Sequence, residues 1–202
     1  DSLREHAAET QQHVERELSG RSGVSVKRSL WLVNAIIVAV DTDAVEIKQL
    51  VELDGVIRVH RTSKEGQATT RNRELSTTIN QQGDLDREYS YGLEMMNVPQ
   101  VWDRYGVRGE GVRIAVIDTG VDPSHPDIDL AGWAEFDADG ERVDSEPHDE
   151  VGHGTGLSSL ATGGDASGLH IGVAPTAELL AAKHDEADFV VAAMAAIAWA
   201  IE

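Results

Sequence analysis

The chain has 202 residues and no cysteine, so neither a disulfide framework nor thiol chemistry can contribute to its function. It carries 36 acidic and 17 basic residues, and its formal net charge of −19 argues against nucleic acids or anionic membranes as partners. The imbalance is uneven: residues 1–83 hold 12 acidic and 11 basic residues, whereas residues 84–202 hold 24 and 6. This asymmetry predicts two modules with different surfaces.

Lysine is rare, and carboxylates are spread over several predicted elements. Such a surface is typical of a protein that works in high salt, where screening removes the repulsion between like charges. A halophilic source is therefore one hypothesis, and an ordinary acidic protein is the alternative. A fold that is equally stable in dilute buffer and in molar salt would favour the alternative.

The first module is predicted to be a small α+β domain. Apolar residues at helical spacing predict an amphipathic helix over 3–18, and residues 24–40 predict two strands or one long bent strand, with Asn34 in a turn. Asp41-Thr42-Asp43 resembles the N-cap of a second helix, and residues 56–59 predict a further strand. The order helix–strand–strand–helix–strand lacks only a first strand to make a ferredoxin-like unit.

Residues 63–88 are rich in Thr, Ser, Gln, Asn and charge, which predicts an exposed linker. A second module follows over 89–202. Its predicted elements are a short helix beginning near Pro99, buried strands over 114–117, 171–174 and 179–182, and a last helix over 190–201.

The strand predicted over 114–117 ends at a carboxylate, Asp118. Its short, β-branched apolar run fits a strand that is buried on both faces of a parallel sheet. A carboxylate at the carboxyl end of such a strand lies where open α/β sheets place their functional groups. An aspartate that only caps a turn is the alternative interpretation.

A second stretch, Gly152-His153-Gly154-Thr155-Gly156, is predicted to bring a histidine to the start of a helix. Together the two stretches resemble the subtilisin-like serine proteases. Asp118-Thr119-Gly120 resembles the Asp motif of that family and His153-Gly154-Thr155 its His motif, in the family's order. Matches at His125-Pro126-Asp127 and Gly172-Val173-Ala174-Pro175 support the resemblance.

The resemblance implies an α/β fold, with an incomplete subtilisin-like parallel-sheet domain over 89–202. A ferredoxin-like propeptide domain over 1–62 would precede it, with a maturation site in the linker 63–88. Asp118 would orient the imidazole of His153, which would act as general base for a nucleophilic serine. The propeptide would dock on the catalytic domain, the substrates would be proteins or peptides, and the enzyme would be secreted after loss of a leader.

The nucleophile of the family stands in a Gly-Thr-Ser-Met-Ala-like motif on a later helix, and this motif does not occur in the chain. Ser158 and Ser159 follow His153 on the same predicted helix and are expected to be packing residues. We therefore expect part of a serine endopeptidase precursor that does not hydrolyse peptides by itself. The alternative is a catalytically inactive homologue that binds or inhibits a protease.

Asp127 matches a calcium-ligating aspartate in many members of the family, and a hard carboxylate oxygen suits Ca²⁺. A solvated surface aspartate is the alternative. A zinc site built from His125, His148, His153 and the nearby aspartates is a weaker idea, because the chain has no His-Glu-x-x-His motif. Calcium is thus the only cofactor that the sequence suggests.

Overall fold

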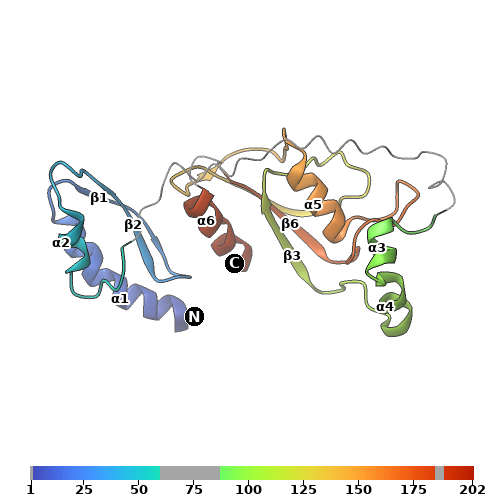
Figure 1. Ribbon diagram of the computed structural model, residues 1–202, viewed down its shortest axis with the longest axis horizontal. Helices are drawn as coiled ribbons and strands as arrows, with labels where there is room; N and C mark the ends of the chain where they lie inside the picture. Colours follow the sequence, from blue (N-terminus) through green and yellow to red (C-terminus); the bar gives the residue numbers. More distant parts are fainter. Residues whose placement is uncertain (1, 60–86, 185–188) are drawn as a thin grey trace. The chain divides into compact units, whose positions relative to one another are not determined.

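The structure is a computed structural model that describes residues 2–59, 87–184 and 189–202. The chain divides into two compact units, residues 1–65 and residues 66–202 (Figure 1). The linker predicted over 63–88 falls almost entirely outside the described residues, so it stays a prediction.

The first unit packs two helices against an antiparallel hairpin. Helix α1 (Ser2–Ser19) matches the predicted amphipathic helix, and the hairpin consists of β1 (Val24–Leu30) and β2 (Ala35–Val40). Asn34 has a φ of 49° in the turn between the strands, a conformation that asparagine tolerates better than most residues. Helix α2 (Ile47–Val51) completes the unit. The helices and the segments beside α2 share one buried apolar cluster, made of Val14, Leu18, Val45, Leu50 and Leu53.

Helix α2 begins later than the sequence predicts, since Asp41 caps a turn and not the helix. The Asp41 carboxylate accepts a hydrogen bond from the Asp43 backbone N–H at 3.0 Å. The Asp41 carbonyl accepts another from the Val45 backbone N–H at 2.9 Å. An aspartate side chain that bonds to the backbone two residues later forms such turns readily.

The strand predicted over 56–59 is wrong. Val56 and Val59 pack against the apolar cluster, whereas Ile57 is 95% exposed. Burial at a spacing of three residues does not fit a strand, in which alternate residues share a face. The described part of this unit therefore has a two-stranded sheet, and the last strand of the expected ferredoxin-like order is missing from it.

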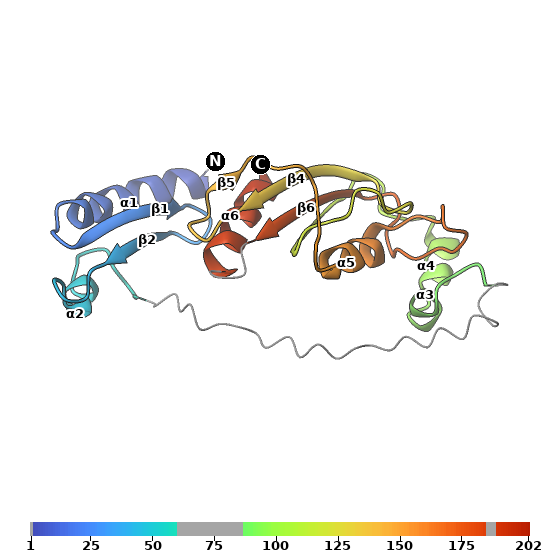
Figure 2. The same cartoon turned by 90° about the horizontal axis from the view of Figure 1, so that it is seen from above.

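The second unit is a mixed α/β structure around a mostly parallel sheet of four strands (Figures 1 and 2). The strand order is β3-β6-β4-β5; the first three are parallel, and β5 is antiparallel to β4. The sequence predicts two of these strands and misses the other two. The bounds are Arg113–Asp118 for β3, Leu130–Phe136 for β4, Arg142–Val143 for β5 and Glu178–His184 for β6.

Strand β3 is an outer strand of the described sheet, and Ala115 is exposed. The expectation that β3 is buried on both faces is therefore wrong within the described residues. An outer strand has a neighbour on one side only, so part of its surface stays open to solvent.

Helices α5 (His153–Thr162) and α6 (Phe189–Ile201) cover opposite faces of this sheet. Ile117 packs against the cluster under α6, whereas the neighbouring Asp118 meets α5, and successive side chains of a strand point to opposite faces. Helix α6 forms as predicted, with Val190 and Ile201 about half exposed. Its buried contacts with the sheet involve small side chains, Ala134, Ala182, Ala192, Ala195 and Ala196, together with Phe136.

The strand predicted over 171–174 is also wrong, because this segment covers the end of helix α5. The Val173 backbone N–H donates to the Leu160 carbonyl at 3.0 Å, and the Ala174 N–H donates to the Ala161 carbonyl at 2.9 Å. The last carbonyls of a helix have no partner within the helix, so a neighbouring segment satisfies them. The backbone of this segment is thus held at the end of a helix and not in a sheet.

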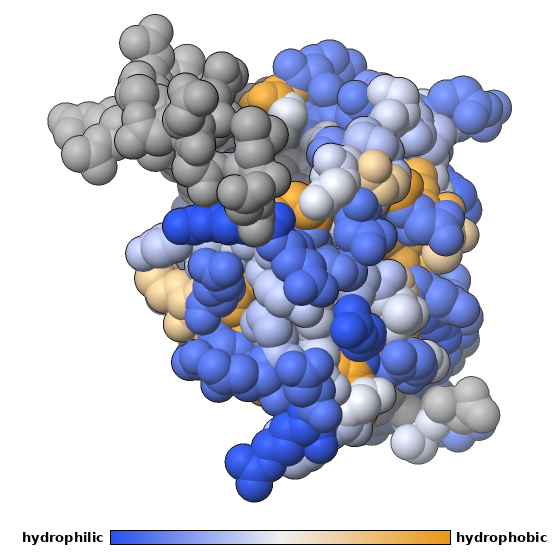
Figure 3. Space-filling model, turned by 90° about the vertical axis from the view of Figure 1, so that its right-hand side faces the viewer, coloured by the Kyte–Doolittle hydropathy of each residue, from blue (hydrophilic) through white to orange (hydrophobic). Residues whose placement is uncertain are grey.

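Two short helices precede the sheet, α3 (Tyr91–Met95) and α4 (Val98–Tyr105). Pro99 lies in the first turn of α4, as the sequence predicts. Trp102 of α4 is buried and donates its indole N–H to the Val173 carbonyl at 3.0 Å, which attaches α4 to the segment after α5. The surface seen from the right-hand side of Figure 1 is mostly hydrophilic, with apolar residues in scattered spots (Figure 3).

No helix in the described ranges is both long enough and apolar enough to cross a bilayer.

The buried cluster of the first unit yields a prediction about stability. Replacing Leu50, which is 3% exposed, with alanine should lower the free energy of unfolding of this unit by about 2–5 kcal/mol, because it leaves a cavity. The matched control Ile57→Ala should change it by less than about 0.5 kcal/mol, since Ile57 is 95% exposed. Hydrogen exchange of the amides in β1 and β2 measures both values. Equal effects would contradict the packing described here.

Candidate active site

The structure brings Asp118 and His153 together. Asp118 is the last residue of β3, His153 is the first residue of α5, and the His153 Nδ1 and Asp118 Oδ1 atoms are 2.7 Å apart. An ionised carboxylate can only accept hydrogen bonds, so Nδ1 carries the proton and Nε2 keeps a free lone pair. The Asp118 side chain is 17% exposed and that of His153 is 62% exposed. The geometry therefore suits an imidazole that is held from one side and accessible from the other.

Two glycines allow this approach of β3 and α5. A Cβ atom on Gly154 would lie 2.2 Å from the Gly120 carbonyl oxygen, and a Cβ on Gly120 would lie 2.0 Å from the His148 carbonyl oxygen. Gly120 also has a φ of 122°, which other residues rarely adopt. The glycines of the Asp and His motifs are thus needed because the backbones touch.

Thr119 links the two segments on either side of this contact. Its backbone N–H donates to Asp118 Oδ1 at 2.7 Å, which fixes the carboxylate. Its hydroxyl oxygen accepts from the Gly154 N–H at 2.9 Å, which fixes the residue after His153. Its carbonyl accepts from Lys183 Nζ at 2.8 Å. Thr119 therefore contacts the Asp motif, the His motif and the neighbouring strand β6.

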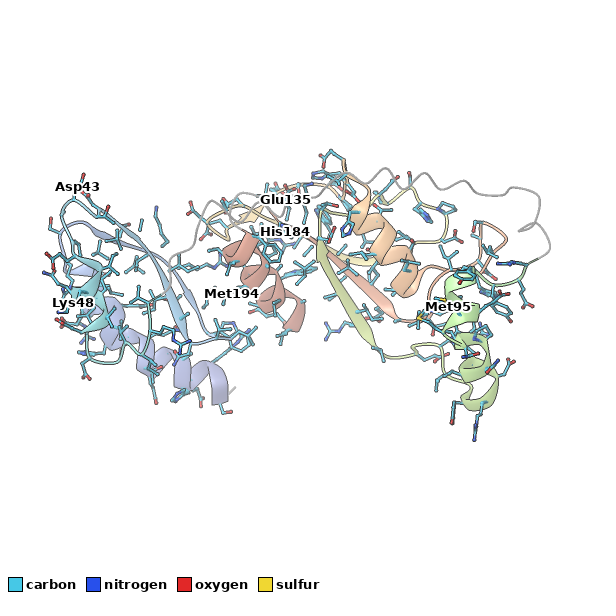
Figure 4. The ribbon with its side chains drawn as sticks, in the orientation of Figure 1. Asp43, Lys48, Met95, Glu135, His184 and Met194 are labelled. Atoms are coloured by element: carbon cyan, nitrogen blue, oxygen red, sulfur yellow. The ribbon has the colours of Figure 1, made fainter. Side chains whose placement is uncertain are left out.

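Polar side chains gather at the carboxyl ends of the parallel strands. Lys183 of β6 lies opposite Asp118 in one strand pairing and opposite Glu135 of β4 in the other. Glu135 and His184 lie near the ends of the adjacent strands β4 and β6 (Figure 4). Lys183 Nζ also donates to the Glu150 carboxylate at 2.8 Å, and this hydrogen bond lowers the pKa of Glu150. Open α/β sheets place their functional groups at this edge.

Two polar residues of the site were not singled out from the sequence. Asp149 accepts hydrogen bonds from the loop before α5 and from the first turn of α5. Burial alone would raise the pKa of Asp149, but the hydrogen bonds, led by that of the Thr155 hydroxyl, outweigh it and hold the pKa well below its usual range. Lys183 carried a usable signal, since it is the one lysine in residues 84–202 and directly follows the strand predicted over 179–182.

Asp127, the predicted calcium ligand, is 6% exposed, so the alternative of a solvated surface aspartate is wrong. Its Oδ1 accepts the Ser167 N–H at 3.0 Å, and its carbonyl accepts the Gly164 N–H at 2.8 Å. Asp127 therefore holds the loop after α5. Among the residues that the structure covers, no group of three or more His, Cys, Asp or Glu side chains could hold a metal ion, so the zinc idea has no support.

The two serines that follow His153 behave as packing residues. Ser158 is fully buried in α5, and Ser159 donates its hydroxyl to the Gly156 carbonyl of the same helix at 2.8 Å.

The glycine contact predicts a contrast between two positions of α5. Gly154→Ala should lower the free energy of unfolding by about 1–3 kcal/mol, because its methyl group would meet the Gly120 carbonyl. Gly156→Ala should raise it by about 0.5–1 kcal/mol, since no atom lies within 4 Å of the added methyl and alanine favours helix. Urea unfolding of both variants measures the difference. Equal stabilities would contradict the close approach.

The lowered pKa of Asp149 predicts a pH dependence of stability. Its carboxylate stabilises the fold at pH values above the unfolded-state pKa of about 3.9, and this contribution is lost as the pH falls towards the lower folded-state pKa. Urea unfolding of the wild type and Asp149→Asn should give a constant difference above about pH 5 and a shrinking one below about pH 4. A difference that stays constant down to the lowest pH would contradict this assignment.

Comparison with known proteins relates the segment that carries both motifs to a family of proteases. The sequence profile of the subtilase family matches residues 109–202. The chain is 38% identical over 99 residues to the major intracellular serine protease of Bacillus subtilis, an alignment that covers 48% of this chain and 30% of that protein. It is 39% identical over 102 residues to the thermostable alkaline protease of Halalkalibacterium halodurans, covering 49% and 26%.

Thermitase of Thermoactinomyces vulgaris is 36% identical over 98 residues, covering 46% of this chain and 32% of that protein. The chain thus spans about a third or less of the curated relatives that it matches. Its C-terminal half, which contains Asp118 and His153, is homologous to serine proteases of the subtilase family.

Proposed function

We propose that the protein is a subtilisin-like serine endopeptidase, made as a precursor, that hydrolyses peptide bonds in proteins or peptides. The observation that carries the proposal is the 2.7 Å contact between His153 Nδ1 and Asp118 Oδ1 in a segment homologous to subtilases. No Gly-Thr-Ser motif occurs in the 202 residues, so the proposal requires a nucleophilic serine from sequence outside them.

In the proposed mechanism, His153 takes a proton from the serine hydroxyl at Nε2 and later gives it to the leaving amine. Asp118 keeps the proton of the imidazole on Nδ1 and stabilises the imidazolium when it forms. The Thr119 N–H fixes the Asp118 carboxylate, and Lys183 holds the Thr119 carbonyl, so the orienting group cannot easily turn away. The exposed part of the imidazole leaves room for a nucleophile and a substrate.

The proposal includes a role for the first unit as a propeptide that docks on the catalytic domain. Its support is the position of a small, nearly neutral α+β unit ahead of the homologous segment. A halophilic habit is supported by the net charge of −19. Calcium binding at Asp127 and secretion rest on the resemblance to the family alone, and one of the relatives is named as intracellular.

Hydrolysis of a denatured protein by the natural product, purified from source cells in high salt, tests the proposal. His153→Ala should lower the rate by about 10⁴-fold or more, and Asp118→Asn by about 10⁴-fold, because either change removes the prepared base. Gln100→Ala, at an exposed position of α4 in the second unit, is the control and should leave the rate unchanged. Retention of full activity in His153→Ala would overturn the mechanism.

The intact mass of the same preparation separates the two functions that the sequence leaves open. A mass well above the 21.8 kDa of the 202 residues, together with labelling by a fluorophosphonate, supports the endopeptidase. A mass equal to it, with no hydrolysis, favours the inactive homologue that binds or inhibits a protease.

A further inference from the structure

Asp149 makes an unusual number of hydrogen bonds for a single side chain of a loop. Figure 2 shows this loop as the extended connection from β5 to α5. Oδ1 accepts from the Thr119 hydroxyl at 2.9 Å, the Gly152 N–H at 2.9 Å and the Val151 N–H at 3.1 Å. Oδ2 accepts from the Thr155 N–H at 2.9 Å and the Thr155 hydroxyl at 2.6 Å. The four residues come from both sides of the catalytic pair.

Asp149 bonds to residues on both sides of His153 but not to its imidazole ring. On the α5 side, the carboxylate holds Gly152, immediately before His153, and Thr155, two residues after it. On the β3 side, it holds Thr119, immediately after Asp118. The backbone atoms that carry both members of the pair are therefore joined through one carboxylate.

The direction of the Thr119 hydrogen bonds depends on Asp149. A hydroxyl has one proton to donate, and Thr119 gives it to Asp149. Its oxygen is therefore free to accept the Gly154 N–H at 2.9 Å. A chain of hydrogen bonds thus runs from Asp149 through Thr119 to the residue that follows His153.

The charge of Asp149 suits its place at the start of a helix. The first N–H groups of α5 have no partners within the helix, and the helix dipole favours a negative charge there. All five hydrogen-bond donors around the Asp149 side chain bond to its two carboxylate oxygens. An amide at this position would place an NH₂ group against a donor on one of its two sides. Asparagine is therefore not an equivalent residue here, although its shape is nearly the same.

We propose that Asp149 is a positioning residue that sets the approach of His153 to Asp118. This inference rests on the proposed function for its catalytic meaning, but the geometric part concerns the 202 residues alone. Asp149 holds the turn after Asp118 and the first turn of α5 at a fixed separation. Without Asp149, His153 remains at the start of α5, but its imidazole loses its alignment with the Asp118 carboxylate.

The first experiment measures the tautomer of His153 by long-range ¹H–¹⁵N NMR in the 202-residue chain at a pH where the imidazole is neutral. The Asp118 contact selects the Nδ1–H form, and loss of alignment releases the ring to the Nε2–H form that free imidazoles favour. Asp149→Asn should convert most of His153 to the Nε2–H form. Thr119→Val should do the same, and Thr119→Ser should restore the wild-type form, because serine keeps the hydroxyl.

Asp122→Asn is the matched control for charge. The Asp122 carboxylate accepts hydrogen bonds from the N–H and the hydroxyl of Ser124 at 2.9 and 2.7 Å, and the Asp122 backbone N–H donates to the Thr155 hydroxyl. The substitution removes the same charge near α5 and leaves that backbone contact in place. His153 should therefore stay in the Nδ1–H form. A folded Asp149→Asn or Thr119→Val variant with an unchanged tautomer would overturn the inference.

The second experiment measures hydrolysis by the protein as its source cells make it, with the same substitutions introduced. Asp149→Asn should lower kcat by about 10–100-fold and leave KM within about threefold, because it disturbs alignment and not substrate binding. An active enzyme with unchanged kcat in Asp149→Asn would overturn the inference and leave the proposed function standing. A tautomer change without hydrolysis in the wild type would retain the geometric inference and remove the proposed function.

Discussion

The backbone contact between Gly120 and Gly154 is the constraint on which the rest of the site depends. A methyl group on Gly154 would lie 2.2 Å from the Gly120 carbonyl oxygen, so no larger residue fits without moving α5 away from β3. His153 directly precedes Gly154 and Asp118 lies two residues before Gly120, and the 2.7 Å separation of the two side chains follows from the same contact. The hydrogen bonds of Thr119 then hold β3 and α5 at the short distance that the glycines permit.

The two faces of the sheet in the second unit have different roles: one packs against α6, and the other carries the candidate active site. On one face, α6 lies close to β4 and β6 because the contact is made of alanines such as Ala182 and Ala196. On the other face, α5 brings its first turn to a polar network. Strand β3 belongs to both, since Ile117 packs towards α6 and Asp118 points to α5. A shift of one residue in this strand would exchange the two roles.

The site is strongly acidic, yet its carboxylates are satisfied. Asp149 is held by hydroxyl and backbone N–H donors, Asp118 by His153 and a backbone N–H, and Glu150 by Lys183. Directed hydrogen bonds stabilise a partly buried carboxylate such as that of Asp149, and they are less sensitive to salt than surface ion pairs. A protein with a net charge of −19 can therefore keep an ordered anionic site.

Local features could be predicted from the amino-acid sequence: the helices with clear periodicity, and the pairing of Asp118 with His153 through motifs that carry their own glycines. The assignments of 56–59 and 171–174 as strands were wrong, because Val56 and Val59 pack against an apolar cluster and the backbone of 173–174 bonds to the end of α5. The buried face of α6 depends on how the helix packs against the sheet. The tertiary structure also decided the role of Asp149, whose bond to Thr119 joins residues 30 positions apart, a distance at which sequence spacing carries no geometric information.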